Sequence, residues 1–227
     1  MAKPPSKPGA GPRGTHVNVK TARSRSNASQ RWLLRQLNDP YVKKAQAAGY
    51  RSRAAFKLIE LDERFKLLKP GQRVVDLGAA PGGWSQVALR ALGERGQVVA
   101  LDLLPMDTLA GAKILQGDFQ DDATEAAVLE ALGGQADLVL SDMAPNTTGH
   151  GPTDHLRIMD LASLALDFAV KVLAPGGGFV AKVFQGGSEK AMLERLRRHF
   201  TEVRHAKPPA SRKESSELYV VATGFRA

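Results

Sequence analysis

Short apolar runs rich in β-branched residues alternate along this chain with longer segments whose apolar residues recur at helical spacing. The short runs predict seven strands, at residues 73–77, 98–101, 113–115, 137–141, 178–184, 202–206 and 218–224. The longer segments predict helices at residues 84–92, 123–132, 154–173 and 188–200. Their alternation predicts an α/β fold with a mostly parallel sheet, crossover helices and a hairpin-like final pair of strands.

The pattern before the first strand is different. Residues 1–30 are rich in Pro, Gly, Ser and Arg and have almost no apolar content, so we expect disorder until a partner is met. Residues 31–48 return to helical spacing around a break, and Pro40 suits the first turn of the helix that follows. Residues 50–65 predict another helix, with Ser52 as its N-cap.

These changes in composition divide the chain. We expect a basic extension at 1–28 and a single domain at 29–227. Within that domain, a helical part at 29–70 precedes the α/β core at 71–227.

The stretch QRVVDLGAAPGGWSQ, residues 72–86, is a predicted strand, a turn of small residues and the start of a helix. Such a loop lets a ligand approach bare backbone at the carboxyl end of a strand, where open α/β sheets bind ligands. A nucleotide-like cofactor is therefore the first hypothesis for this stretch.

Acids follow the next three predicted strands. Asp102 ends the second strand, where a carboxylate can accept both ribose hydroxyls of an adenine nucleoside, as it also does in dehydrogenases. Asp118 follows the third strand and either accepts the amine of an adenine or is an ordinary turn aspartate. Asp142 follows the fourth strand and projects into the crevice above the sheet.

Two charged residues occur in strands that the pattern predicts to be buried. Lys182 must reach an end of the sheet, pair with acids or lose its proton. Glu217 opens the last strand, and we expect both to cluster with Asp142 at one rim of the sheet. Lys57, on the helix at 50–65, is by pattern alone best explained as a solvated lysine.

Composition narrows the possible chemistry. The chain of 227 residues contains no cysteine, which excludes disulfides, thiolate metal sites and a cysteine nucleophile. Two histidines, His150 and His155, have no matching cluster, so we expect no metal. No apolar run approaches the roughly 20 residues of a membrane-spanning helix, so we expect a soluble cytoplasmic protein.

The formal charge of +9 is unevenly distributed. The first 53 residues contain twelve basic residues and one acid, so the rest of the chain carries a net charge of −2. Such a basic segment indicates a polyanionic partner, and a solubilising tail is the alternative for its first part.

Seven motifs together resemble the FtsJ/RrmJ (RlmE) family of large-subunit ribosomal RNA 2′-O-methyltransferases. They are SRAAFKL, DLGAAPGGWSQ, LDLLPMD, LQGDF, SDMAPN, LAPGGGFVAKVFQG and SRKESSELYVVATG. The resemblance covers about residues 29–224. It implies a Rossmann-like class I methyltransferase fold, with a seven-stranded, mostly parallel sheet, helices on both faces and an antiparallel final strand.

The resemblance also implies a site. A catalytic Lys-Asp-Lys-Glu tetrad in the family matches Lys57, Asp142, Lys182 and Glu217. The S-adenosyl-L-methionine site, whose product is S-adenosyl-L-homocysteine, would include Gly82, Trp84, Asp102, Asp118 and Asp142.

The chemistry of a ribose 2′-OH requires alignment and a base. A free lysine has a pKa of about 10.4, so Lys182 can be that base only if it is desolvated or close to another cation such as Lys57. We expect Asp142 to hold Lys182, and Lys57 with Glu217 to position the hydroxyl.

The substrate implied by the resemblance is a uridine in the A-loop of large-subunit ribosomal RNA, within an assembled or nearly assembled large ribosomal subunit. We expect a monomer that binds no membrane.

Three alternatives stay open. A Rossmann dehydrogenase would not explain the AAPGG loop. A base N-methyltransferase usually has Asn/Asp-Pro-Pro-aromatic where this chain has DMAP, and a non-catalytic assembly factor would not need the tetrad.

Overall fold

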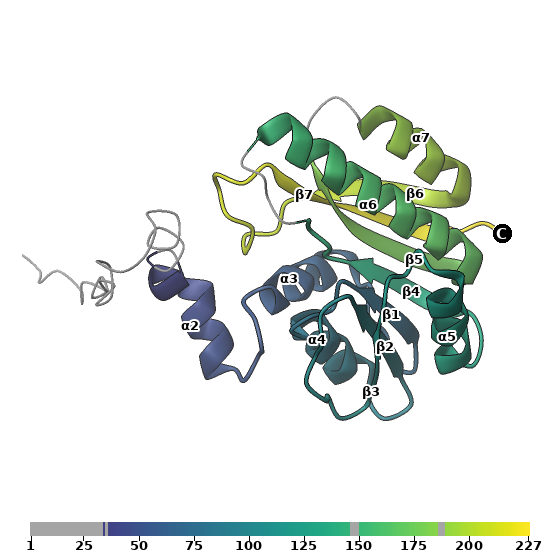
Figure 1. Cartoon of the computed structure of the whole chain (residues 1–227), viewed down its shortest axis with the longest axis horizontal. Coiled ribbons are helices and arrows are strands. Elements are labelled where there is room, and N and C mark those ends of the chain that lie inside the picture. The colour runs from purple at the N-terminus through teal and green to yellow at the C-terminus, as the bar shows by residue number, and fades with distance from the viewer. Residues whose placement is uncertain (1–33, 35, 146–149, 186–188) are drawn as a thin grey trace, which may run out of the picture.

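The computed structural model describes residue 34 and residues 36–145, 150–185 and 189–227. The described chain contains a seven-stranded sheet in the order β3-β2-β1-β4-β5-β7-β6 (Figure 1). The strands are β1 (Arg73–Leu77), β2 (Gln97–Asp102), β3 (Ala112–Gln116), β4 (Ala136–Ser141), β5 (Leu173–Phe184), β6 (Phe200–Ala206) and β7 (Glu217–Phe225). The helices are α2 (Pro40–Ala47), α3 (Ala55–Phe65), α4 (Gly83–Leu92), α5 (Asp122–Leu132), α6 (Gly151–Val172) and α7 (Glu189–His199).

Strand direction divides the sheet. The first five strands pair in parallel, whereas β7 is antiparallel to both β5 and β6. The prediction of a mostly parallel seven-stranded sheet with an antiparallel final strand is therefore confirmed. β5 begins at Leu173, five residues before the predicted start, because Leu173 pairs with Ala136 ahead of a shift in register.

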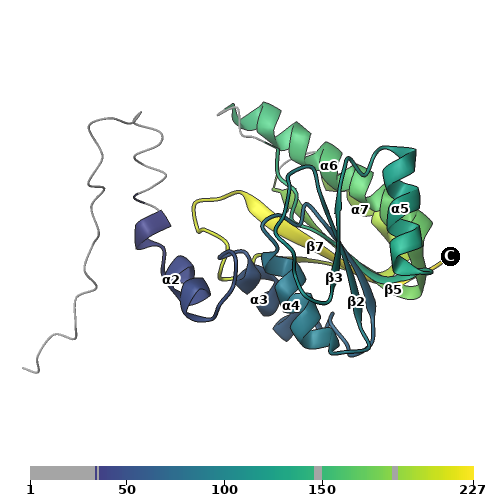
Figure 2. The same cartoon turned by 60° about the horizontal axis from the view of Figure 1, so that its bottom comes forward.

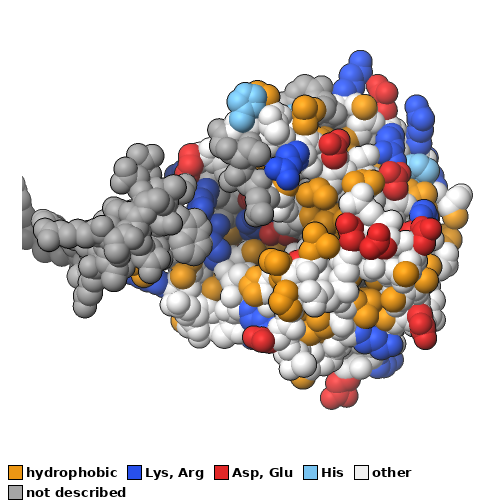
Figure 3. Space-filling model, viewed as in Figure 1, with side chains coloured by type: hydrophobic (Ala, Val, Ile, Leu, Met, Phe, Trp, Pro, Cys, Tyr) orange, Lys and Arg blue, Asp and Glu red, His pale blue; other side chains and the backbone are white. Residues whose placement is uncertain are grey.

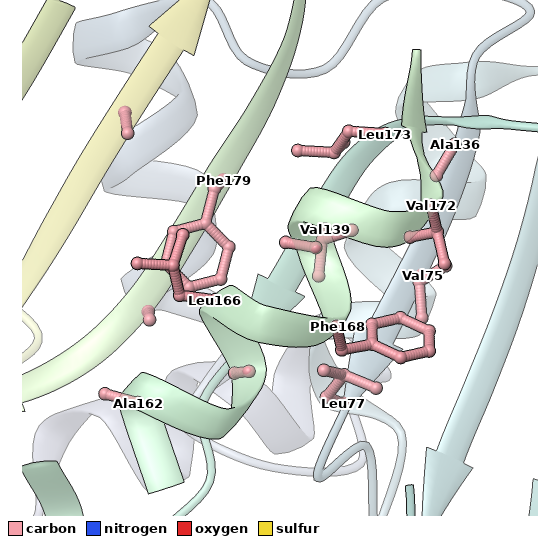
Figure 4. Packing of buried hydrophobic residues seen from close by; sticks show 14 of the residues in the cluster. Val75, Leu77, Ala136, Val139, Ala162, Leu166, Phe168, Val172, Leu173 and Phe179 are labelled. Carbon is pink, nitrogen blue, oxygen red and sulfur yellow. The ribbon is translucent and has the colours of Figure 1, made fainter. Parts of the chain in front are cut away.

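Two hydrophobic layers cover the two faces of the sheet. On one face, α5, α6 and α7 pack against the strands, and Figure 4 shows Leu166 of α6 beside Phe179 and Phe168 of α6 beside Leu77. On the other face, α3 and α4 pack against the strands through residues such as Leu58. α2 projects to the side beyond α3 (Figures 1 and 2).

Helix starts follow local chemistry. Asp39 caps α2 by accepting a hydrogen bond from the Tyr41 backbone N–H at 2.9 Å, and Pro40 occupies the first turn as predicted. The prediction that Ser52 caps the next helix is wrong. α3 begins at Ala55, and backbone carbonyls three residues upstream, including that of Ser52, accept its first N–H bonds.

The segment after β4 also differs from expectation. The sequence predicts a loop at residues 146–153 and a helix from residue 154, but α6 begins at Gly151, with Pro152 in its first turn. Residues 146–149, like the extension at 1–28, lie outside the described residues. No helix in the described ranges is long and apolar enough to cross a membrane.

Candidate active site

The site lies at the edge of the sheet where the parallel strands end. Asp142 directly follows β4, and Lys182 lies near the end of β5. Because β7 runs in the opposite direction, its first residue, Glu217, reaches the same edge and pairs with Phe184. Lys57 reaches this edge from α3. The structure therefore brings together all four residues that the resemblance matched to a tetrad.

Ion pairs connect these four side chains. The Lys57 Nζ atom lies 2.8 Å from Glu217 Oε2 and 3.5 Å from Asp142 Oδ1. The Lys182 Nζ atom lies 2.9 Å from the same Asp142 Oδ1 and donates to the Asp142 backbone carbonyl at 2.8 Å. Two ammonium groups and two carboxylates thus balance in charge, and each side chain is at most 15% exposed.

The carboxylate at the centre of the cluster is ionised. Burial by itself would raise the pKa of Asp142, but the nearby Lys182 and Lys57 ammonium groups lower this pKa to about 2. With a pKa this far below neutral pH, the Asp142 carboxylate has no proton and accepts hydrogen bonds without donating any. Asp142 therefore holds both lysines from one fixed acceptor.

Tyr219 is a fifth member of the cluster that the sequence reasoning missed. Its hydroxyl accepts a hydrogen bond from Lys57 Nζ at 2.9 Å and donates one to Asp142 Oδ1. Burial, followed by the charges of Asp142 and Glu217, raises the pKa of Tyr219 well above 10, so the phenol keeps its proton. The alternation of β7 contained the signal, since Tyr219 lies two residues after Glu217 and on the same face.

A cleft of about 540 Å³ adjoins this cluster. It is lined by the glycine loop and by residues after β2, β3 and β4, including Asp102, Asp118 and Asp142. The two oxygens of Asp102 accept backbone N–H bonds from Ala80 and Leu104 at 2.9 and 2.8 Å, which fixes this carboxylate at the wall. Because Asp142 lines the cleft and also belongs to the cluster, a ligand in the cleft lies beside the lysines.

The glycine loop packs closely against the segment after β4. Gly78 has a φ of 72°, and a Cβ atom there would lie 2.5 Å from Met143 Cγ. Only glycine permits this approach. The predicted cofactor residues Gly82 and Trp84 lie at the start of α4, and the lining of the cleft reaches Gly78 and Ala80 but not these two. Trp84 is buried, and its indole N–H donates to the Ala54 carbonyl at 2.8 Å.

These features fit S-adenosylmethionine. A bare glycine turn, two carboxylates at the ends of β2 and β3, and an apolar wall that includes Phe119 suit a charged amino acid joined to a nucleoside. In the described ranges, no three His, Asp or Glu side chains gather as a metal site would require.

Three basic residues around the start of α3 have separate partners. Arg51 donates to the backbone carbonyls of Pro81, Asp107 and Thr108, which ties the glycine loop to the segment after β2. Arg53 forms an ion pair with Asp39 at 2.8 Å, and Lys57 enters the cluster. Although these three residues are close in sequence, they therefore stabilise three different parts of the site.

The strand order, the glycine loop after β1 and the cleft bounded by the ends of β2, β3 and β4 define a Rossmann-like methyltransferase. The sequence profile of the FtsJ-like methyltransferases matches residues 50–225, and the chain belongs to that family.

Individual relatives agree with this assignment. Proteins from Granulibacter bethesdensis and Acidiphilium cryptum, both named ribosomal RNA large subunit methyltransferase E, are 65% and 66% identical to this chain. The alignments cover 97% and 92% of this chain and 95% and 92% of those proteins. A crystal structure of a ribosomal RNA methyltransferase from Plasmodium falciparum is 30% identical, has a TM-score of 0.70, and covers 78% of this chain and 98% of its own. The family resemblance of the sequence motifs is therefore confirmed.

Proposed function

We propose that this protein transfers a methyl group from S-adenosylmethionine to the ribose 2′-OH of a uridine in the A-loop of large-subunit ribosomal RNA. The carrying observation is that the Lys57–Asp142–Lys182–Glu217 cluster lies directly beside the cleft, with Asp142 common to both. When bound, S-adenosylmethionine supplies a methyl group already activated by a sulfonium.

In this proposal the protein has to align the hydroxyl and remove its proton. Lys182 first loses its ammonium proton to solvent, and its neutral amine then accepts the 2′-OH proton, while Asp142 fixes the position of that amine from two directions. Lys57 and Glu217 hold the hydroxyl. Asp102 holds the cofactor ribose and Asp118 its adenine, while Gly82 and Trp84, which do not line the cleft, support the glycine loop from the start of α4.

The RNA partner agrees with the charge distribution. Lys43 and Lys44 are exposed on α2, and Figure 3 shows basic side chains beside the hollow of this face, on the side from which α2 projects. The basic first quarter of the chain would follow phosphates and bring the target uridine to the rim of the sheet. We propose a monomer that acts in the cytoplasm on an assembled or late-assembly large subunit.

The test combines Lys182→Met with methyl-tritiated cofactor and large ribosomal subunits that lack the modification. We expect the wild-type protein to label one ribose, which mapping places in the A-loop, and Lys182→Met to lose at least about a thousandfold in single-turnover rate. Cofactor affinity should stay within about twofold, and the exposed Lys190→Met is the control. If Lys182→Met retained most of the transfer, the base assignment would be wrong. Label on a base would overturn the proposed reaction.

A further inference from the structure

A hydroxyl in the loop between β6 and β7, residues 207–216, contacts a carboxylate of the catalytic cluster. The Ser211 Oγ atom donates to Glu217 Oε1 at 2.7 Å, while the other oxygen of that carboxylate, Oε2, binds Lys57 at 2.8 Å. Ser211 is buried, with 5% of its surface exposed. Each oxygen of Glu217 thus has a separate side-chain donor.

We propose that Ser211 is a positioning residue, which orients the Glu217 carboxylate so that Oε2 is directed at Lys57. This inference rests on the proposed function, because Glu217 and Lys57 act there on the ribose hydroxyl. The terminal torsion of a glutamate is broad and is not fixed by its own rotamer preferences. A second hydrogen bond on the opposite oxygen is what defines the plane of the carboxylate.

Orientation matters because Lys57 has competing acceptors. Its ammonium group also donates to the Tyr219 hydroxyl at 2.9 Å and lies 3.5 Å from Asp142 Oδ1. A Glu217 carboxylate turned away from Lys57 would leave that amine to the remaining acceptors, closer to the pair formed by Asp142 and Lys182. Ser211 therefore keeps Lys57 at the side of the cluster where Glu217 lies.

The loop that carries Ser211 is anchored by α3 and the turn before it. Arg53 donates to the Ala210 backbone carbonyl at 2.5 Å, and the Ala210 N–H donates to Glu60 Oε2 at 2.6 Å. Both backbone groups of the residue before Ser211 are thereby fixed. Since α3 also carries Lys57, one helix sets the positions of both partners of Glu217.

The contacts that anchor this loop also extend to α2. Arg53 forms its ion pair with Asp39, whose other oxygen caps α2. The N-terminal helical part is therefore tied to the β6–β7 loop through two half-buried charged groups, with side chains 16% and 8% exposed.

The test compares Ser211→Ala with Ser215→Ala in the full-length protein, at saturating RNA and cofactor. Ser215 is in the same loop, but its hydroxyl accepts from the Glu217 backbone N–H and does not touch the carboxylate. We expect Ser211→Ala to lower the single-turnover rate about tenfold, the effect of losing one hydrogen bond to a charged group. Its RNA and cofactor affinities should stay within about twofold of wild type, and Ser215→Ala should retain most of the rate.

A double-mutant cycle separates positioning from a general structural role. In a Glu217→Ala background, Ser211→Ala should have no further effect on the rate, because Ser211 acts only through that carboxylate. Should Ser211→Ala not fold, Arg53→Met loosens the loop without touching either residue and should show the same rate loss, again absent with Glu217→Ala. Equal rates for wild type and Ser211→Ala, or additive losses in the cycle, would overturn the inference. Absence of transfer by the wild-type protein would instead overturn the proposed function.

Discussion

Asp76 provides a direct test of the electrostatics beneath the glycine loop. It lies in the middle of β1 and is 1% exposed, and its Oδ2 accepts a hydrogen bond from Ser85 Oγ at 2.6 Å. Within the described part of the chain, its Oδ1 has no hydrogen-bond partner. Burial, in spite of the Ser85 bond, raises the pKa of Asp76 from 3.8 to about 7, and the charges of Asp142 and Asp102 add to this increase.

The sign of the effect on stability follows from proton binding. Between about pH 4 and pH 7 the folded protein keeps a proton on Asp76 that the unfolded chain has lost, so the free energy of unfolding falls as the pH rises. Above about pH 7 both states are ionised and the loss is complete. At about 1.4 kcal/mol per pH unit, the total is about 4 kcal/mol, of which about 2 to 3 kcal/mol falls between pH 5 and pH 8.

The perturbation is Asp76→Asn, which has no charge at any pH. The amide leaves a buried N–H group without an evident acceptor, a loss that is independent of pH, so the diagnostic quantity is the slope. Urea unfolding of both proteins without cofactor, from about pH 5 to pH 8, should show the variant gaining about 2 to 3 kcal/mol relative to wild type. Asp160→Asn, the same change at an exposed carboxylate, is the control. A difference between Asp76→Asn and wild type that does not change with pH would refute the reasoning.

Three further predictions concern the ligands and the loop. Asp102→Ala should weaken cofactor binding by about ten- to a hundredfold in calorimetry, because it removes a carboxylate fixed at the wall of the cleft, and should leave RNA affinity unchanged. Replacing the exposed Lys43 and Lys44 by alanine should lower the magnitude of the slope of log K against log salt by about 1.4 in RNA titrations. An unchanged slope would show that these α2 lysines do not contact RNA phosphates. Gly78→Ala should destabilise the protein by about 1–3 kcal/mol in thermal unfolding, since the new Cβ meets Met143 at a positive φ; a variant as stable as wild type would contradict the close approach.

Strands were the most predictable part of this fold. All seven were found, and those buried on both faces, such as β1, read as continuous aliphatic segments, whereas the partly exposed strands β3 and β6 have more polar sequences. Helix starts were less predictable, since they depend on which groups satisfy the first N–H donors. Asp39 uses its side chain at the start of α2, whereas the N–H groups at the start of α3 use backbone carbonyls.

The candidate site shows a different limit. Pattern alone assigned Lys57 to solvent, yet it is 6% exposed, because residues 57, 58 and 61 lie on the helix face that packs against the sheet. The family resemblance, and not periodicity, brought Lys57 into the site. Tyr219 and Ser211 were missed because their roles come from contacts across the fold, and hydroxyl groups leave no distinctive pattern in sequence.

The position of β7 at the end of the chain also sets the order in which the parts of the site are synthesised. Glu217 bonds to Lys57 across 160 residues, whereas the cleft is lined by residues 78–161. A ribosome synthesising this chain therefore makes all the lining of the cleft well before it makes the seventh strand. Every residue that lines the cleft is therefore present in the nascent chain before Glu217 can complete the four-residue cluster beside it.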